Sequence, residues 1–425
     1  MIFLRQQIIL PSETNIDIII FYFKLAKCYG LLPRLGGGGK DGVNHINSWI
    51  LYLDKTVKTI AFKLGQLMDV LHINNDSNQS EGSKIEMPNE FTGCNLLQKV
   101  YLLKGQIQIL CRCTSELYLT PAPFVKTIKP GQIFRLLKYL SKIRMAQLST
   151  ALGHENKVVL AAMPEVYDSF VKLMNDFLRF ATEDLTLYLP NILEFITKLF
   201  TDIRQTGGIQ QTGDKPFATL KNSLHKLLES LCDIFGAGVS IEKYADEIIP
   251  FVISDFLPAN ETITLNITGG VNSSLSKKQK KASQQATGMN LLNREAKKKA
   301  TNSLTVASSL KALASVLKAS GTFLSESCHR SIQACVIGTC MDVQRCAIKG
   351  RPIPFNEPEC RSSLFQALYS LLSNPHPKTP APFRHAFGIF RHGHLNDRHP
   401  RVQDVCLQGN ILIFLDTRRS NKLSK

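Results

Sequence analysis

The stretch "LPNILEFITKLFTDI", Leu189 to Ile203, decides the fold class of this 425-residue chain. Its large apolar residues recur at offsets of three, four and seven, and the set is Leu189, Ile192, Leu193, Ile196, Leu199, Phe200 and Ile203. These offsets place the set on one face of an α-helix. The stretch therefore predicts an amphipathic helix that buries one face against its neighbours.

Helical periodicity continues along much of the chain on both sides of this stretch. The pattern predicts helices at about 45–71, 133–151, 163–181, 187–205, 217–235, 241–257, 303–319, 323–342, 361–373 and 381–391, with further apolar regions at 96–119 and 402–415. Residues 1–30 show no clear pattern.

Three junctions between these segments look alike. They begin at Phe180, Phe235 and Ala319, and each ends one helix, turns on small residues and opens another apolar helix. With the polar stretch 258–302 set aside, the spacing indicates a period of roughly 40 residues, typical of armadillo or HEAT units. The predicted fold is an all-α, armadillo/HEAT-like solenoid, and the alternative is an irregular helical domain.

Residues 258–302 are rich in Ser, Asn, Gln, Thr and Lys and contain few large apolar residues, so we expect a disordered basic insertion. The chain then divides into an unpatterned N-terminus with a Gly-rich connection (1–44), a helical-repeat region (45–257), the insertion (258–302), the continued repeat region (303–415) and a frayed tail (416–425).

Composition indicates a globular chain with a strong positive charge. Hydrophobic residues make up 44%, charged residues 20%, and the net charge is +17, which favours an acidic partner such as RNA or an acidic protein tail. Eleven cysteines without a CxxC pair, and no signal peptide at the start, suit reduced thiols in the cytosol or nucleus. The apolar run Ile18–Phe23 is too short for a membrane helix.

The glycine-rich stretch "LLPRLGGGGK", Leu31 to Lys40, raises the possibility of a nucleotide-binding P-loop. That motif requires Gly-Lys followed by Ser or Thr, whose hydroxyl holds magnesium. Here Asp41 follows Gly39-Lys40, and Arg34 stands where the first glycine belongs. A flexible connection is the better interpretation.

Two lysine-rich clusters lie inside the insertion and are a candidate nuclear import signal: Lys277, Lys278, Lys280 and Lys281, then Arg294, Lys297, Lys298 and Lys299. Basic clusters separated by a polar spacer suit an acidic import-receptor groove, but they also suit phosphate binding or a merely solvated loop.

Two LxxLL motifs are candidate partner motifs: Leu224, Leu227 and Leu228, and Leu368, Leu371 and Leu372. On a helix, such leucines share one face that can dock in a hydrophobic groove of a receptor-type domain. The same leucines belong to the predicted core stripes, and packing in the core is the alternative.

Metal-binding and catalytic patterns are weak. The cluster Cys328, His329, Cys335, Cys340 and Cys346 fits no standard zinc spacing, so core thiols are favoured. His385, His392, His394 and His399, with Asp397 and Asp404, supply no tetrahedral set at a known spacing. Searches for GxSxG, HExxH, paired catalytic carboxylates and kinase signatures find nothing, so we expect no catalytic, cofactor or metal residues and a protein that is not an enzyme.

Four segments, in order, resemble the proline-, glutamic acid- and leucine-rich protein family, the animal counterpart of the yeast pre-rRNA-processing RIX scaffold. They are "LLPRLGGGG" with the following Trp-containing helix, "KPFATLKNSLHKLLESLCDIFGAG" from Lys215, "SLKALASVLKASGTFLSESCHRSIQACVI" from Ser309, and the region from Leu371 to about residue 413.

The resemblance implies a nuclear and nucleolar scaffold in ribosome biogenesis, without cofactors. Its implied partners are WD-repeat and helical-repeat subunits of a pre-ribosomal complex and the AAA ATPase of large-subunit maturation. Relatives are also described as nuclear-receptor coactivators acting through LxxLL motifs. The family's Pro- and Glu-rich C-terminal region and its N-terminal helices have no counterpart here, so the sequence is expected to be a truncated form.

Overall fold

The computed structural model describes residues 16–35, 37–72, 93–122, 126, 130–181, 183–207, 215–257, 303–346 and 354–423. Throughout these ranges the chain forms α-helices joined by turns and short 3-10 segments, and no β-strand occurs in them. The helices are α1 (Ile16–Leu31), α2 (Val43–Val70), α3 (Leu96–Leu119), α4 (Pro130–Leu140), α5 (Met145–Thr150), α6 (His154–Phe180), α7 (Leu189–Gly207), α8 (Lys215–Phe235), α9 (Ala245–Phe256), α11 (Ser303–Ser320), α12 (Glu326–Arg345), α13 (Pro358–Ser373), α14 (Phe383–Asn396) and α15 (Pro400–Leu423). The all-α prediction is confirmed.

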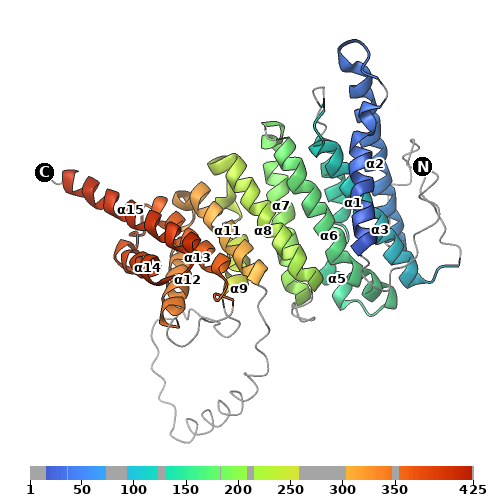
Figure 1. The fold of residues 1–425 in the computed structure, drawn as a ribbon. Coiled ribbons are helices and arrows are strands. Elements are labelled where there is room, and N and C mark those ends of the chain that lie inside the picture. The colour runs from blue at the N-terminus through green and yellow to red at the C-terminus, as the bar shows by residue number, and fades with distance from the viewer. Residues whose placement is uncertain are drawn as a thin grey trace, which may run out of the picture.

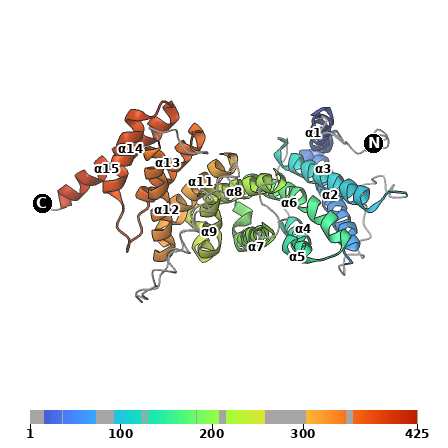
Figure 2. The ribbon, with the colours of Figure 1, turned by 90° about the horizontal axis from the view of Figure 1, so that it is seen from below.

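The helices stack in two layers along an elongated array (Figure 1). One layer is a row in which α3, α6, α8, α11, α13 and α15 pack side by side in that order. On the other side of this row, α5, α7, α9, α12 and α14 follow one another, as Figure 2 shows for α5 to α12. One helix of the second layer thus alternates with one helix of the row, which is the helix-pair repeat of a solenoid.

The three predicted junctions share a structural feature, a 3-10 segment between two helices. These segments are Glu183–Tyr188 before α7, Gly236–Val239 with Ile241–Lys243 before α9, and Gly321–Phe323 before α12. A 3-10 segment tightens the chain at the end of a helix and lets the next helix turn back across it. The similarity of the junctions in sequence therefore reflects a shared turn of the repeat.

The row continues across the predicted insertion. Both α8 and α9, which precede residues 258–302, pack directly against α11, which follows them. Residues 258–302 themselves lie outside the described residues. The helices on the two sides of this segment therefore form one continuous stack.

Helix α1 lies in the region where the sequence shows no clear pattern. It packs against α3 through small residues: Ala26 is fully buried, and a Cβ at Gly30 would lie 2.6 Å from Thr120 Oγ1 and 2.8 Å from the Glu116 carbonyl oxygen. Large apolar side chains also lie on exposed sides of α1, at Phe21, Phe23 and Leu31, so no single apolar stripe marks its buried side in the sequence. The expectation of an unpatterned N-terminus therefore missed this helix.

The glycine-rich stretch connects α1 to α2. Gly37, Gly39 and Gly42 have φ values of 70°, 65° and 74°, in the left-handed region that suits glycine. The segment turns the chain between two helices and follows no β-strand of the kind that a P-loop requires. The interpretation as a connection agrees with this geometry.

The core of the first repeats is aromatic. Trp49 of α2 packs against Tyr118 of α3 and Phe180 of α6, with ring centroids 6.1 and 6.4 Å apart. The Trp49 Nε1–H also donates a buried hydrogen bond to the Leu117 carbonyl, 3.1 Å away. The only tryptophan of the chain therefore joins three helices and satisfies its polar atom while it is buried.

Two predicted boundaries differ from the structure. The segment predicted at 133–151 is divided into α4 and α5 by the turn at residues 141–144, and α6 starts at His154 rather than near residue 163. No helix of the described residues has a stretch long and apolar enough to cross a membrane.

Close packing of α14 on α15 depends on two glycines. A Cβ at Gly409 would lie 2.5 Å from the ring of Phe390, and one at Gly393 would lie 2.5 Å from Cys406 Sγ. Phe390 and Cys406 are both fully buried, so neither has room to withdraw. Hydrogen in place of a side chain lets these two helices approach each other.

Replacing Gly409 by alanine should therefore destabilise the C-terminal repeats, although alanine is the better helix former. Overpacking in a closed core costs about 1–3 kcal/mol, which exceeds the gain of about 1 kcal/mol in helix propensity. Urea denaturation measures the effect. Gly388→Ala, on the exposed side of α14 with nothing within 4 Å of its Cβ, is the control and should increase stability. An equal gain from both substitutions would contradict the packing described here.

Candidate interaction surfaces

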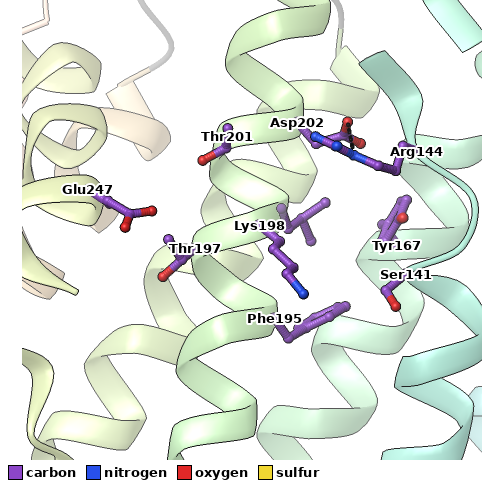
Figure 3. A pocket seen from close by; sticks show the side chains of 10 residues that line it. Ser141, Arg144, Tyr167, Phe195, Thr197, Lys198, Thr201, Asp202 and Glu247 are labelled. Carbon is purple, nitrogen blue, oxygen red and sulfur yellow. Dashed lines mark ion pairs between the residues drawn. The ribbon is translucent and has the colours of Figure 1, made fainter. Parts of the chain in front are cut away.

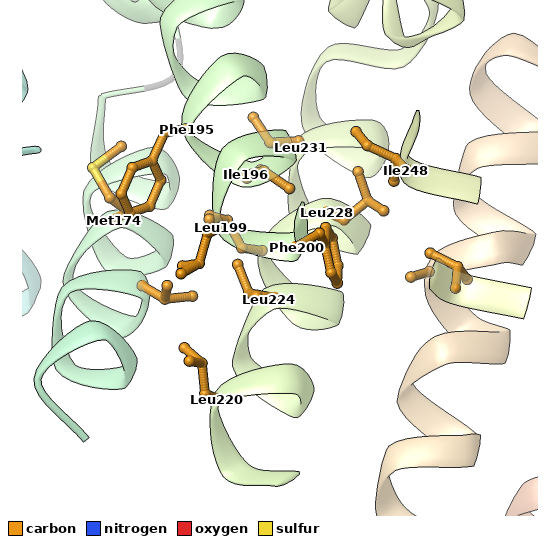
Figure 4. Close-up of a cluster of buried hydrophobic side chains, with 14 of the residues drawn as sticks. Met174, Phe195, Ile196, Leu199, Phe200, Leu220, Leu224, Leu228, Leu231 and Ile248 are labelled. Carbon is orange, nitrogen blue, oxygen red and sulfur yellow. The ribbon is translucent and has the colours of Figure 1, made fainter. Parts of the chain in front are cut away.

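The six leucines of the two LxxLL motifs lie in the core. Leu224, Leu227, Leu228, Leu368 and Leu371 are fully buried and Leu372 is 3% exposed. Figure 4 shows Leu224 and Leu228 of α8 within a cluster that includes Phe200 of α7. The helices α8 and α13 are inner members of the row, with neighbours on both sides. In this fold the motif leucines are not exposed for docking, and of the two interpretations left open above, core packing matches their position.

The lysine-rich clusters at 277–281 and 294–299 fall outside the described residues, so their placement is not described.

Polar side chains buried between neighbouring helices join these helices to one another. Lys221 Nζ of α8 lies 2.5 Å from Asp255 Oδ1 of α9, and His225 Nε2 lies 3.3 Å from Asp255 Oδ2. Burial alone would raise the pKa of Asp255, but hydrogen bonds and charges from His225 and Lys221 hold it below its ordinary value. Ser223 Oγ of α8 donates to Asp168 Oδ1 of α6 at 2.5 Å. The contacts of Asp255 and Asp168 therefore join α8 to α9 and to α6.

A pocket of about 380 Å³ lies between α6, α7 and α9 (Figure 3). Its most buried charge is Asp202, which accepts hydrogen bonds from the backbone N–H groups of Met145 (2.7 Å) and Ala146 (2.9 Å). Burial raises the pKa of Asp202, opposed by these two bonds and by Arg144, whose Nε lies 3.7 Å from Oδ1. Asp202 therefore stabilises the start of α5.

Tyr167 and Lys198 of the pocket also have structural partners. Tyr167 Oη donates to the Ile143 carbonyl at 2.6 Å, and Lys198 Nζ pairs with Glu194 at 2.5 Å on the surface. Among the residues described as lining the pocket, no nucleophile is hydrogen-bonded to a base. The contacts of Asp202 and Tyr167 therefore join α7 and α6 to the turn before α5.

The cysteine and histidine clusters do not assemble a metal site. Within the described ranges, no three side chains of His, Cys, Asp or Glu come close enough to share a metal ion. All eleven cysteines lie in these ranges, and none of them is paired in a disulfide. Burial raises the pKa of Cys328 to about 12 and that of Cys340 well above its ordinary value, so both remain neutral thiols. These two positions match the core-thiol interpretation.

The histidine cluster at 385–399 contains an interaction that the sequence did not reveal. Asp397 lies between α14 and α15 and forms a bidentate ion pair with Arg361 of α13. Arg361 Nε donates to Oδ2 at 2.7 Å, and Nη2 donates to Oδ1 at 3.0 Å. Both side chains are buried. No local spacing signals this pair, because its members lie 36 residues apart. Asp397 therefore has a structural role in place of the metal role considered above.

Comparison with known proteins supports the resemblance. No protein-family model matches the chain. The chain is 22% identical over 375 residues to proline-, glutamic acid- and leucine-rich protein 1 of Xenopus laevis, with 86% of the chain and 36% of that relative aligned. The match covers most of the chain. The chain is similar to the proline-, glutamic acid- and leucine-rich protein family.

A second relative has the same name. Proline-, glutamic acid- and leucine-rich protein 1 of Mus musculus is 23% identical over 384 residues, which are 87% of the chain and 34% of the relative. The chain thus spans about a third of the length of the proline-, glutamic acid- and leucine-rich proteins that it matches. The similarity is of low identity and covers 86% and 87% of the chain.

Proposed function

We propose that this chain is a non-enzymatic scaffold of ribosome biogenesis, which acts in pre-rRNA processing and large-subunit maturation in the nucleolus and nucleoplasm. The observation that carries the proposal is the stacked array of helix pairs, in a chain of which 86% aligns with a proline-, glutamic acid- and leucine-rich protein. A solenoid presents a long surface on which several partners bind at once.

The proposed partners are those that the family resemblance implies: a WD-repeat protein, a second helical-repeat protein and the AAA ATPase of large-subunit maturation, on a pre-ribosomal particle. The net charge of +17 supports attraction to a particle rich in RNA. Entry into the nucleus is assigned to the basic residues of 277–281 and 294–299.

Receptor coactivation through the LxxLL motifs receives less support. It requires the motif leucines to lie on an exposed helix face, whereas Leu224 and Leu368 are fully buried. Exposing them would require α8 and α13 to leave the row. We therefore propose the scaffold ahead of the coactivator.

Affinity purification of the tagged chain from separate nuclear and cytoplasmic extracts, with mass spectrometry, tests the proposal. We expect the chain in the nuclear fraction together with pre-large-subunit assembly factors. Leu228→Asp places a charge in the core and should abolish this copurification, whereas Leu187→Asp, at a position 87% exposed, should retain it. Recovery of nuclear receptors without assembly factors, or a chain confined to the cytoplasm, would contradict the proposal.

A further inference from the structure

The segment from Asn374 to Arg401, which contains α14, has a strongly basic surface. Its one acidic residue, Asp397, is buried against Arg361. The whole chain has 51 basic and 34 acidic residues, so its average composition does not account for a segment of this length without an exposed carboxylate. The exposed lysine and arginine residues of the segment are Lys378, Arg384, Arg391, Arg398 and Arg401.

The arginines on α14 and in the turn after it have no partner within the described residues. The side chains of Arg384, Arg391 and Arg398 form no ion pair or hydrogen bond there. By contrast, all three arginines of the neighbouring helices α12 and α13 are paired with a carboxylate, and these pairs are Arg330–Glu326 (2.6 Å), Arg345–Asp342 (3.7 Å) and Arg361–Asp397 (2.7 Å). The arginines of α14 therefore do not hold helices together and are available to a ligand.

These arginines face away from the row of helices. Arg384 and Arg391 are seven residues apart, so they lie on one side of α14, and Phe387, which is 47% exposed, lies between them on that side. Gly393 is two residues from Arg391 and lies on the opposite side, where it packs on Cys406 of the row helix α15. A solenoid grows along its axis, so a further repeat would lie beside α14 and would not cover its arginine side.

Acidic residues of the helices that pack on α14 do not offset this charge. Glu326 and Asp342 of α12 are held by arginines of their own helix. Asp404 of α15 is exposed, but it is two residues from Cys406, which faces α14, so it lies on the far side of α15. Helix α14 itself contains no acidic residue. Its arginine side therefore attracts a polyanion.

The rings beside the arginines select the kind of polyanion. An acidic peptide and a nucleic acid would both be attracted by charge, but only a nucleic acid carries flat bases that stack on exposed aromatic rings. Phe387 lies between Arg384 and Arg391, and His385 is exposed next to Arg384. Stacking on side chains requires unpaired bases, so this arrangement suits a single strand.

We propose that the exposed side of α14 binds single-stranded RNA, with Arg384, Arg391 and Arg398 on its phosphates and Phe387 stacked on a base. We call these four residues the α14 stripe. The inference rests on the scaffold function proposed above, since it identifies a surface through which such a scaffold holds the RNA of a pre-ribosomal particle.

Fluorescence anisotropy with the full chain tests the proposal. The probe is a labelled oligouridylate of about 12 nucleotides, a length within the site sizes of single-strand binding proteins. The comparison ligands are duplex RNA of the same length and a polyglutamate peptide with the same number of charges. We expect saturable binding of the single strand and at least about tenfold weaker binding of polyglutamate.

A triple substitution tests the arginines. Arg384→Gln, Arg391→Gln and Arg398→Gln together should weaken RNA binding at least about tenfold at about 0.1 M salt and lower the slope of log K against log salt by about 2, since each phosphate contact on a single strand contributes about 0.7. The matched control removes the same charge at three exposed lysines elsewhere and should bind within about threefold of the unchanged chain. Its substitutions are Lys157→Gln, Lys243→Gln and Lys318→Gln.

A single substitution tests the stacking. Phe387→Ala should weaken binding of the single strand at least about fivefold, leave its salt dependence unchanged, and leave binding of duplex RNA unchanged. Phe323→Ala, at a position 62% exposed in the 3-10 segment before α12, is the matched control and should bind normally. All the substituted positions are exposed, so circular dichroism should show an intact fold for each variant.

Three results would overturn the proposal: no saturable binding of the single strand, equal losses from the arginine and lysine triples, or no effect of Phe387→Ala. Equal binding of polyglutamate through the same arginines would also overturn it and would identify an acidic protein segment as the occupant. RNA binding by the purified chain is measured separately from copurification with assembly factors, so failure of this inference is distinguishable from failure of the scaffold function.

Discussion

Leu224→Ala is expected to lower the free energy of unfolding by about 2–5 kcal/mol, because it leaves a cavity at a fully buried position of α8. The side chains around Leu224 include Leu199 and Phe200 of α7. Helix α7 is itself packed between α5 and α9, so these side chains can move only partly into the cavity. Urea denaturation followed by circular dichroism measures the change.

The control for this substitution is Leu187→Ala, at a position 87% exposed in the 3-10 segment before α7, which should change stability by less than about 0.5 kcal/mol. The two LxxLL interpretations predict different results. If Leu224 served mainly to dock a partner, Leu224→Ala would remove partner binding and leave the unfolding curve unchanged, and that result would contradict its assignment to the core.

Asp397→Ala is expected to destabilise the C-terminal repeats by about 3–5 kcal/mol, because it leaves the Arg361 guanidinium buried without its counter-ion. Arg361 is 4% exposed and Asp397 is 5% exposed. Arg361 also donates to the carbonyls of Phe355 (3.0 Å) and Asn356 (2.8 Å), so the ion pair holds α13, the turn that precedes it and the α14–α15 turn together. Thermal or urea denaturation measures the loss.

An exposed ion pair of the same chain is the control for this prediction. Arg345 Nη1 lies 3.7 Å from Asp342 Oδ1, and the two side chains are 77% and 51% exposed. Asp342→Ala should change stability by less than about 1 kcal/mol, because water screens such a pair. Equal effects of Asp397→Ala and Asp342→Ala would show that Arg361 finds other partners or water once the carboxylate is removed.

The helices with strong apolar stripes could be predicted from sequence because their burial is one-sided. In α7 and α8 the large apolar residues mark the buried side, so period alone located these helices. Helix α1 was missed because its buried side carries the small residues Ala26 and Gly30, while Phe21, Phe23 and Leu31 are exposed, so no apolar stripe marks the buried side.

The candidate surfaces were harder to predict than the helices. The sequence marked Val402 to Leu415 as an apolar patch, and its apolar residues fall on both sides of α15, more than one buried face requires. These residues can be sorted into covered and exposed ones only once α13 and α14 are known to cover the side with Val402 and Cys406. The two LxxLL motifs were ambiguous as well, because leucines that pack in a core and leucines that dock on a partner have the same spacing in the sequence.

By itself, the sequence determined that this protein is a stack of amphipathic helices with a recurring turn, because helical period and turn chemistry are local properties of neighbouring residues. Only the tertiary structure decided which apolar faces are covered, that Arg361 and Asp397 meet, and that Gly409 admits the ring of Phe390. These features join residues far apart in the chain, and whether a side chain is buried depends on what packs over it rather than on its own sequence neighbourhood.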